Sequence, residues 1–245
     1  MIDILLEVKN LQKSFGNKSV HNDISFKLYK GECLGLLGGS GTGKSVILRA
    51  LIGLEKINSG QIIYEGQQIQ NFNEDQWQHI RKKISYVFQN GALFDSLTVK
   101  ENLAYPLREH FNLTETEIAS KIKILLGEVG LENTEELYPA ELSGGMQKRV
   151  GLLRSIIFSP EIILFDEPTA GLDPFNTLNI QKTILKMKSL GFTSVFVSHD
   201  MPTALAVCDR ILLIKNGKIA EEALPEDIES SNSSLRKFMD GTLKL

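Results

Sequence analysis

Short apolar runs recur along the chain, and polar residues, glycine or proline bound each of them. The runs cover residues 33–37, 84–88, 162–165 and 194–197. Runs of this length without alternation are typical of strands buried on both faces of a parallel sheet. Segments with helical spacing lie between them, so the pattern predicts an α/β fold around a parallel-sheet core.

Other segments alternate between apolar and polar positions. Residues 4–15 and 24–28 follow this pattern, and 61–65 forms a further candidate strand. Alternation is typical of antiparallel strands with one solvated face. Near the C-terminal end, an apolar segment at 210–215 meets the Asn-Gly pair at 216–217, which favours a type I′ hairpin.

Residues from about Asn90 to Phe158 have mainly helical spacing. Capping-box pairs, in which each side chain bonds the other residue's free backbone N–H, predict helix starts. The pairs are Asn73 with Gln76, Thr98 with Glu101, and Thr114 with Glu117. We expect one domain at 1–225 with a helical insertion at about 90–158. A loose tail at 226–245, with a short amphipathic stretch at 235–239, would follow it.

Composition excludes some functions. The chain has 245 residues and a net charge of −3, with basic and acidic residues interspersed, which argues against a nucleic-acid surface. A local basic patch stays open. No apolar run approaches the roughly 18 residues of a membrane span, and the N terminus lacks a signal-peptide pattern. Cys33 and Cys208 lie in apolar contexts, so we expect reduced core residues in a cytosolic protein.

One segment fits the phosphate-binding pattern Gly-x-x-x-x-Gly-Lys-Ser. It reads Gly38-Gly39-Ser40-Gly41-Thr42-Gly43-Lys44-Ser45. Glycines let successive backbone N–H groups turn toward phosphate oxygens, and the N terminus of the following helix adds its positive dipole end. Lys44 would reach the β- and γ-phosphates of a nucleotide, and the Ser45 hydroxyl would bind Mg²⁺. An ordinary glycine-rich turn is disfavoured, because the segment also lies between an apolar strand and a helix.

Asp166 and Glu167 follow the apolar run at 162–165, at the strand end where parallel sheets bind ligands. Asp166 is placed to hold Mg²⁺, and Glu167 to polarise an attacking water. Paired acids at a strand end are alone more often a solvated turn. After a phosphate loop, they favour a nucleotide hydrolase.

The Ser143-Gly144-Gly145 triplet opens a predicted helix. Serine is a good N-cap, and the glycines leave backbone N–H groups exposed, so this helix start suits an anion. For an isolated triplet of this kind, a structural cap without a ligand is the commoner function.

The phosphate loop, the Leu142-Ser143-Gly144-Gly145 element and the Asp166-Glu167 strand end, in this order, resemble the ATP-binding-cassette (ABC) ATPases. The resemblance runs along nearly the whole chain. It implies a P-loop fold with a RecA-like parallel core, an antiparallel β subdomain and an inserted helical subdomain.

The resemblance also implies roles for single residues. Gln89 matches the glutamine that contacts Mg²⁺ and the attacking water, and His199 matches the histidine that contacts the γ-phosphate. Asp173 ends the motif that follows the catalytic glutamate, and Phe15 stands where relatives carry an adenine-stacking aromatic. Alone, a histidine or a strand aromatic of this kind is more often structural.

In ABC ATPases, ATP lies between the phosphate loop of one cassette and the Ser-Gly-Gly signature of another. One set of motifs is present here, so the resemblance implies a head-to-tail dimer with a second copy, which hydrolyses ATP with Mg²⁺. It also implies an integral membrane permease as partner.

Four segments narrow the resemblance to the ATPases of Mla/Mce-type phospholipid transport systems. They are residues 89–94, 102–110, 138–146 and 238–241. This branch implies a peripheral protein on the cytoplasmic face of the inner membrane that energises phospholipid transport for envelope lipid asymmetry. Small accessory and lipid-binding subunits are further expected partners. A groove from Asn90 to about His110, with Leu93, Phe94 and Leu97, would receive a permease helix.

Other functions stay open. The runner-up is the ATPase of a small-solute importer of the amino-acid type. A soluble non-transport ABC ATPase is disfavoured by the acidic balance and by the single cassette. A regulatory module without turnover is opposed by the presence of Glu167 and His199.

Overall fold

The computed structural model describes residues 3–89, 91–228 and 233–243. Asn90, where the predicted docking segment begins, lies outside these residues. So do positions 229–232 and 244–245 of the predicted tail. The helices within the described ranges are all too short or too polar to cross a membrane.

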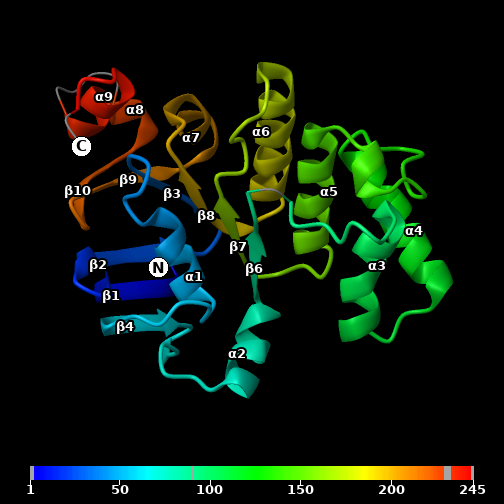
Figure 1. Cartoon of the computed structure of the whole chain (residues 1–245), viewed down its shortest axis with the longest axis horizontal. Coiled ribbons are helices and arrows are strands. Elements are labelled where there is room, and N and C mark those ends of the chain that lie inside the picture. The colour runs from blue at the N-terminus through cyan, green and yellow to red at the C-terminus, as the bar shows by residue number, and fades with distance from the viewer. Residues whose placement is uncertain (1–2, 90, 229–232, 244–245) are drawn as a thin grey trace.

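The described strands form one sheet in the order β5-β4-β1-β2-β10-β9-β3-β8-β7-β6 (Figure 1). They are β1 (Ile4–Phe15), β2 (Lys18–Tyr29), β3 (Cys33–Leu37), β4 (Ser59–Tyr64), β5 (Gln67–Gln68), β6 (Ile84–Val87), β7 (Ile162–Asp166), β8 (Thr193–Ser198), β9 (Arg210–Lys215) and β10 (Lys218–Ala223). Strands β9, β3, β8, β7 and β6 pair in parallel, whereas β5, β4, β1 and β2 pair antiparallel. This confirms the predicted parallel core with an antiparallel subdomain.

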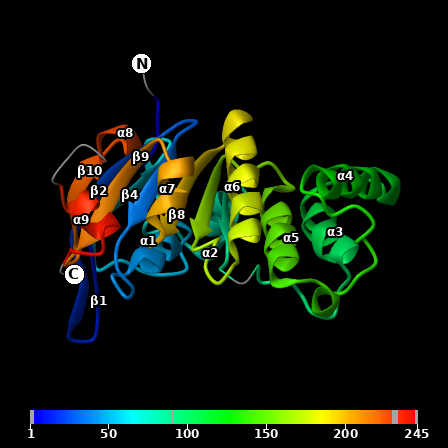
Figure 2. The ribbon, with the colours of Figure 1, turned by 90° about the horizontal axis from the view of Figure 1, so that it is seen from above.

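The described helices are α1 (Lys44–Leu51), α2 (Glu74–Arg81), α3 (Val99–His110), α4 (Glu115–Glu128), α5 (Gly144–Ile156), α6 (Pro174–Ser189), α7 (Met201–Val207), α8 (Pro225–Ile228) and α9 (Ser234–Met239), with a 3₁₀ turn at Pro139–Glu141. Those next to the parallel core cover both of its faces. Figure 2 shows α5 beside α6, with α3 and α4 farther from the sheet at one end of the molecule.

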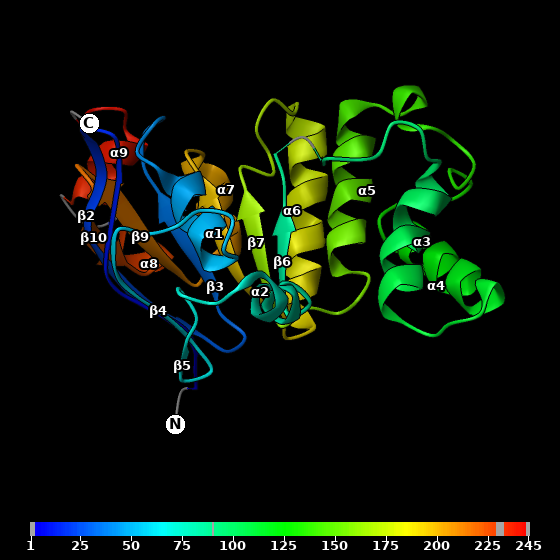
Figure 3. The same cartoon turned by 60° about the horizontal axis from the view of Figure 1, so that its bottom comes forward.

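Alternate residues of the core strands divide the interior in two. Leu164 of β7 packs in a cluster with α1, α2 and the antiparallel strands, while its neighbour Phe165 packs in a second cluster with α6 and α7. Figure 3 shows α1 and α2 in front of the sheet and α6 and α7 behind it. A third cluster joins α3, α4 and α5 into the predicted helical block. Side chains that point alternately to both faces explain why these strands are almost wholly apolar.

The local sequence signals are confirmed where they rest on hydrogen bonds. Asn73, Thr98 and Thr114 each form the complete capping box. Asn216 and Gly217 both have positive φ, of 51° and 72°, as a type I′ turn between β9 and β10 requires. The cysteines are free and buried, as predicted.

The segment after residue 225 differs from the loose tail expected from its polar sequence. Ile228 of α8 and Leu235 of α9 are fully buried in the second cluster. The Ser234 and Leu235 N–H groups donate to Glu221 Oε2 of β10, at 2.6 and 3.2 Å. Burial of a few apolar side chains and these bonds therefore hold α9 against the core.

Candidate active site at the phosphate loop

The phosphate loop, from Gly38 into the first turn of α1 at Ser45, follows β3, and most of its residues line a cleft of about 780 Å³. The other lining residues are Val20, Val46, Arg49, Gln89, Glu167, His199 and Phe238. A cleft of this volume is in the range of ligand sites. The parallel register brings the ends of β3, β6, β7 and β8 to this edge of the sheet, since Leu37 pairs with Ser198 and Asp166 with Val197.

Two glycines of the loop lie where no side chain fits. Gly43 has φ of 89°, and a Cβ there would be 2.4 Å from Val20 Cγ1. A Cβ on Gly38 would be 2.7 Å from the Ile214 carbonyl oxygen. The backbone of the loop therefore lies directly against β2 and β9, and its inner surface consists of peptide groups.

Lys44 places a buried positive charge in this loop. Its side chain is 7% exposed, and Nζ donates to the carbonyl oxygens of Gly38 and Gly39 at 2.8 and 3.1 Å. Nζ also lies 3.6 Å from Glu167 Oε1. Burial lowers the pKa of Lys44, and attraction to Glu167 opposes that shift. The geometry suits an ammonium group that reaches phosphate oxygens inside the loop.

Asp166 is held by two hydroxyl groups. Ser45 Oγ donates to its Oδ1 at 2.7 Å, and the Tyr86 hydroxyl donates to its Oδ2 at 2.6 Å. Burial and the adjacent carboxylate raise the pKa of Tyr86, so it stays a donor. Sequence reasoning missed Tyr86. Its signal is a hydroxyl-bearing residue in the otherwise mainly apolar strand β6.

The Ser45 hydroxyl and the Asp166 carboxylate fit a Mg²⁺ ion, which prefers oxygen ligands. The described residues contain no cluster of three or more His, Cys, Asp or Glu side chains able to hold a metal. One or two protein ligands suit Mg²⁺, because this ion takes its remaining ligands from waters and substrate phosphates.

Glu167 has a strained backbone and a well-held carboxylate. Its φ is 50°, in the left-handed region that few non-glycine residues adopt, and its N–H donates to the Val197 carbonyl oxygen at 2.9 Å. Strain of this kind accumulates at functional sites. His199 Nδ1 lies 2.8 Å from Glu167 Oε2, and Ser198 Oγ lies 3.4 Å from the same oxygen.

The contact with Glu167 fixes the histidine tautomer. A carboxylate only accepts hydrogen bonds, so His199 Nδ1 carries a proton in this contact. The His199 side chain is 60% exposed at the mouth of the cleft. In this arrangement Glu167 is the candidate base, and His199 orients its carboxylate.

The structure thus brings the phosphate loop, Gln89, Asp166, Glu167 and His199 together. Sequence reasoning missed Val20, Arg49 and Phe238 as lining residues of the cleft. Phe15 ends β1 and is 47% exposed, with Lys13 Nζ 4.5 Å from its ring centroid. In the hairpin that β1 and β2 form, Val20 of β2 lines the cleft, and Phe15 is not among the lining residues.

The Ser-Gly-Gly element lies elsewhere, at the N terminus of α5. Ser143 Oγ accepts from the Met146 N–H at 3.3 Å, and Gly144 faces open space. A Cβ on Gly145 would be 2.2 Å from Asn176 Oδ1, so this glycine lets α6 approach. Asp173 caps α6, and its bonds to Asn176 lower its pKa. These residues are not among those that line the cleft.

Comparisons with known proteins agree with this geometry. Residues 21–170 match the family model described as ABC transporter. The chain is 35% identical to the "Intermembrane phospholipid transport system ATP-binding protein MlaF" of Escherichia coli (strain K12), over 97% of this chain and 89% of that protein. It is 36% identical to the "Methionine import ATP-binding protein MetN" of Campylobacter jejuni, over 96% of this chain and 75% of that protein.

A solved structure is also similar. It is that of the ATP-binding cassette MJ0796, dimeric, in a post-hydrolysis state and bound to ADP and Pi. It superposes with a TM-score of 0.83 at 29% identity, over 90% of this chain and 99% of the MJ0796 chain.

Proposed function

The chain belongs to the ABC transporter family as an ATP-hydrolysing cassette, and we propose that it energises phospholipid transport through a membrane permease. The observation that carries the hydrolytic part is the position of Glu167. Its carboxylate lies at the end of β7, between the Lys44 ammonium and the His199 ring.

The side chains of the cleft divide the chemistry among them. Loop N–H groups and Lys44 would bind the β- and γ-phosphates of ATP, and Glu167 would accept the proton of the attacking water. Hydrogen bonding by His199 and Ser198 orients the glutamate. Ser45 and Asp166, with Gln89 nearby, would hold Mg²⁺, which neutralises phosphate charge when it is bound.

We further propose that two copies complete each site. Ser143 and Gly144 present a helix N terminus to solvent, away from the cleft of their own chain. Such a terminus attracts anions. In a head-to-tail dimer, it would face the γ-phosphate held by the phosphate loop of the second copy. The dimeric form of MJ0796 supports a dimer of cassettes.

The choice of phospholipid rests on finer features, because the identities to MlaF and MetN are nearly equal. The segments that resemble the Mla/Mce branch carry exposed aromatic residues, namely Phe94, Tyr105 and Tyr138, at 46–48% exposure. Phe94 and Tyr105 are in edge contact, with ring centroids 5.5 Å apart. They form a surface suited to a cytoplasmic permease helix. Leu93 instead packs in the helical block.

Deleting the gene tests the transported substrate. We expect disturbed envelope lipid asymmetry and lower detergent resistance, with normal amino-acid uptake. Complementation with the wild-type gene should restore both envelope properties, whereas the Glu167→Gln variant should not. Normal envelope lipids together with failed solute import would establish the importer function instead.

Co-purification tests the partners. The chain should bring down an integral permease from the inner membrane, with small accessory and lipid-binding subunits if the system is of the Mla type. Replacing both Phe94 and Tyr105 by Ala should reduce permease recovery without changing ATP binding, because neither residue lines the nucleotide cleft.

A further inference from the structure

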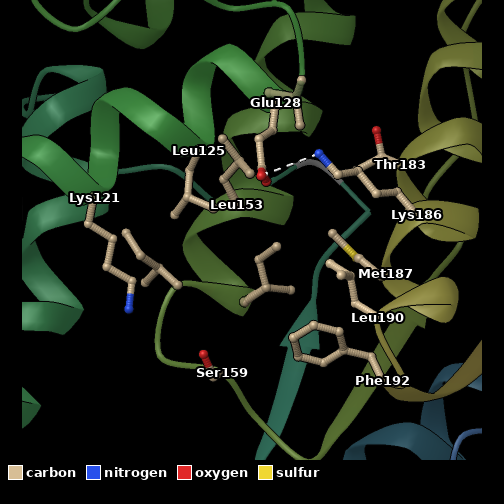
Figure 4. Close-up of a pocket in the computed structure, with 13 residues that line it drawn as sticks. Lys121, Leu125, Glu128, Leu153, Ser159, Thr183, Lys186, Met187, Leu190 and Phe192 are labelled. Atoms are coloured by element: carbon tan, nitrogen blue, oxygen red, sulfur yellow. Dashed lines mark ion pairs between the residues drawn. The ribbon is translucent and has the colours of Figure 1, made fainter.

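A second cavity lies between α4, α5 and α6, apart from the nucleotide cleft. Its volume is about 160 Å³, and its walls are mainly apolar, with Leu125, Leu153, Met187 and Phe192 among them. Figure 4 shows side chains of α4 and α6 facing each other across it. An apolar cavity of about 150 Å³ can stay dry and bind a molecule the size of benzene. The space therefore suits an alkyl chain of roughly six to eight carbons.

A pocket of about 500 Å³ that carries most of the charged side chains lies next to this cavity. The two share Glu128, Val129, Thr183 and Lys186, and the charged pocket adds Arg149 and Lys182. The Lys186–Glu128 ion pair, at 3.3 Å, links α6 to α4 where the two spaces meet (Figure 4). Apolar and charged surfaces thus adjoin at these four shared residues, and the two spaces together are called the groove below.

The charges of this groove are unbalanced. Its cations are Lys121, Arg149, Lys182 and Lys186, and its acid is Glu128. Within residues 3–89, 91–228 and 233–243, neither Lys121 nor Lys182 forms an ion pair within 4.0 Å. Arg149 also lines the pocket, and its Nη1 donates to the Val129 carbonyl oxygen at 2.6 Å. The pocket therefore favours an anion.

Because the apolar cavity lies next to the charged pocket, we propose that the groove binds a single-chain amphiphilic anion. The alkyl chain would occupy the cavity, and a carboxylate or phosphate head would replace Glu128 as the partner of Lys186 and would meet Lys182 and Arg149. None of these residues lines the nucleotide cleft, so the groove is separate from the nucleotide site. The inference also does not depend on which substrate the transporter carries. It concerns a ligand of the cassette itself.

Calorimetry on the purified chain tests the proposal with three eight-carbon probes: octanoate, octyl phosphate and octanol. At least one of the anions should bind with one-to-one stoichiometry and at least tenfold more tightly than octanol, because hydrogen bonds to charged groups are the stronger ones. Whichever anion binds better identifies the head group, a fatty carboxylate or a lipid-type phosphate. If neither anion binds more tightly than the alcohol, the proposal fails.

Chain length gives a second measurement. Each added methylene should tighten binding by about fourfold until the cavity is full. Affinity should therefore rise by about 15-fold from hexanoate to octanoate and level off for longer chains. A steady rise through dodecanoate would indicate adsorption to an open surface and would overturn the proposal.

Variants locate the ligand. Leu125→Trp should fill the cavity and weaken the anions at least tenfold. Lys182→Glu should weaken the anions at least fivefold and leave octanol unchanged. Lys123→Glu is the matched control, because Lys123 is exposed on α4 and lines neither space. Unchanged ATP binding checks the fold of each variant, and Lys182→Glu decides alone if Leu125→Trp fails to fold. Unchanged affinity in Lys182→Glu would place the ligand elsewhere.

Discussion

The two parts of the proposed ATP site are built differently. At the phosphate loop, residues distant in sequence hold one another: Ser45 and Tyr86 both donate to Asp166, and Glu167 contacts His199. At the signature, Ser143 Oγ accepts from the Met146 N–H three positions ahead, and beside it Asp173 caps α6 in the same way.

This difference shows which part of the site one chain completes. At the phosphate loop, Lys44 and Asp166 are buried, and side-chain bonds join Asp166 to Ser45 and Tyr86, so this geometry exists before any partner arrives. The signature is an exposed helix terminus held by local bonds. Binding of nucleotide should therefore depend on the first region, and assembly of the dimer on the second.

The largest effect should come from Glu167→Gln, which removes the base and keeps the phosphate-binding loop. ATP turnover should fall by about 10²–10⁴-fold, the usual contribution of a general base. Phosphate release and equilibrium ATP binding, measured on the same preparation, should separate these quantities. Hydrolysis at the wild-type rate would show that another residue is the base.

Lys44→Ala should weaken nucleotide binding by about 10- to 100-fold, since hydrogen bonds to charged groups contribute about 1.5–3 kcal/mol. A fluorescent ATP analogue titrated into the monomer measures this. Lys148→Ala is the control, because Lys148 contacts the Ala170 carbonyl oxygen and does not line the cleft. Equal losses in both variants would mean that Lys44 acts through the fold.

Ser143→Arg tests the second region. Monomer affinity for ATP should stay within about twofold, while ATP-driven dimerisation should weaken at least tenfold, because a bulky charge at an interface disfavours association. Sedimentation in the Glu167→Gln background measures the dimer without turnover. A loss of monomer binding as large as that of Lys44→Ala would contradict the cross-dimer site.

Tyr86→Phe should reduce turnover by about 2- to 13-fold, because it removes one hydrogen bond worth about 0.5–1.5 kcal/mol from Asp166. The Mg²⁺ concentration for half-maximal rate should rise in this variant, since Asp166 loses part of its positioning. Tyr64→Phe is the matched control, because its hydroxyl donates to Glu161 instead. A rate change without a change in Mg²⁺ dependence would point to general destabilisation.

The smallest effect concerns His21, which is buried beneath the loop with Nε2 3.1 Å from the Gly43 carbonyl oxygen. Burial lowers the pKa of His21 below its usual 6.5. The unfolded chain then binds the proton more readily, so stability contributed by this group is complete above pH 6.5 and declines as pH falls below it. Denaturant midpoints should depend less on pH in His21→Leu. An unchanged pH dependence would exclude His21.

The features that depend on residues close together in the sequence could be predicted from the sequence alone. Apolar runs specify buried parallel strands, and capping pairs specify helix starts, so the order of elements and the position of the phosphate loop could be predicted. The role of Tyr86 was not predicted, because its hydrogen bond to Asp166 joins residues on different strands. The left-handed backbone of Glu167 was not predicted, because glutamate has no preference for this conformation.

The packing of α9 against the core was not predicted, for a related reason. The amphipathic spacing at 235–239 indicates a helix with one apolar face, but serines precede it and it is short, so the sequence does not show what that face packs against. Burial there depends on the second cluster, which collects residues from across the chain. Composition alone therefore suggests a loose tail where tertiary contacts form a helix.

The position of Phe238 has a practical consequence for preparing the protein. This side chain comes from α9, yet it forms part of the nucleotide cleft wall, and Glu221 holds the start of that helix. We expect an affinity tag or fusion at the C-terminal end to disturb α9, which contributes Phe238 to the wall of the nucleotide cleft. Kinetic work on this cassette is therefore best done with the tag placed before β1, and removable tags at both ends would measure the difference.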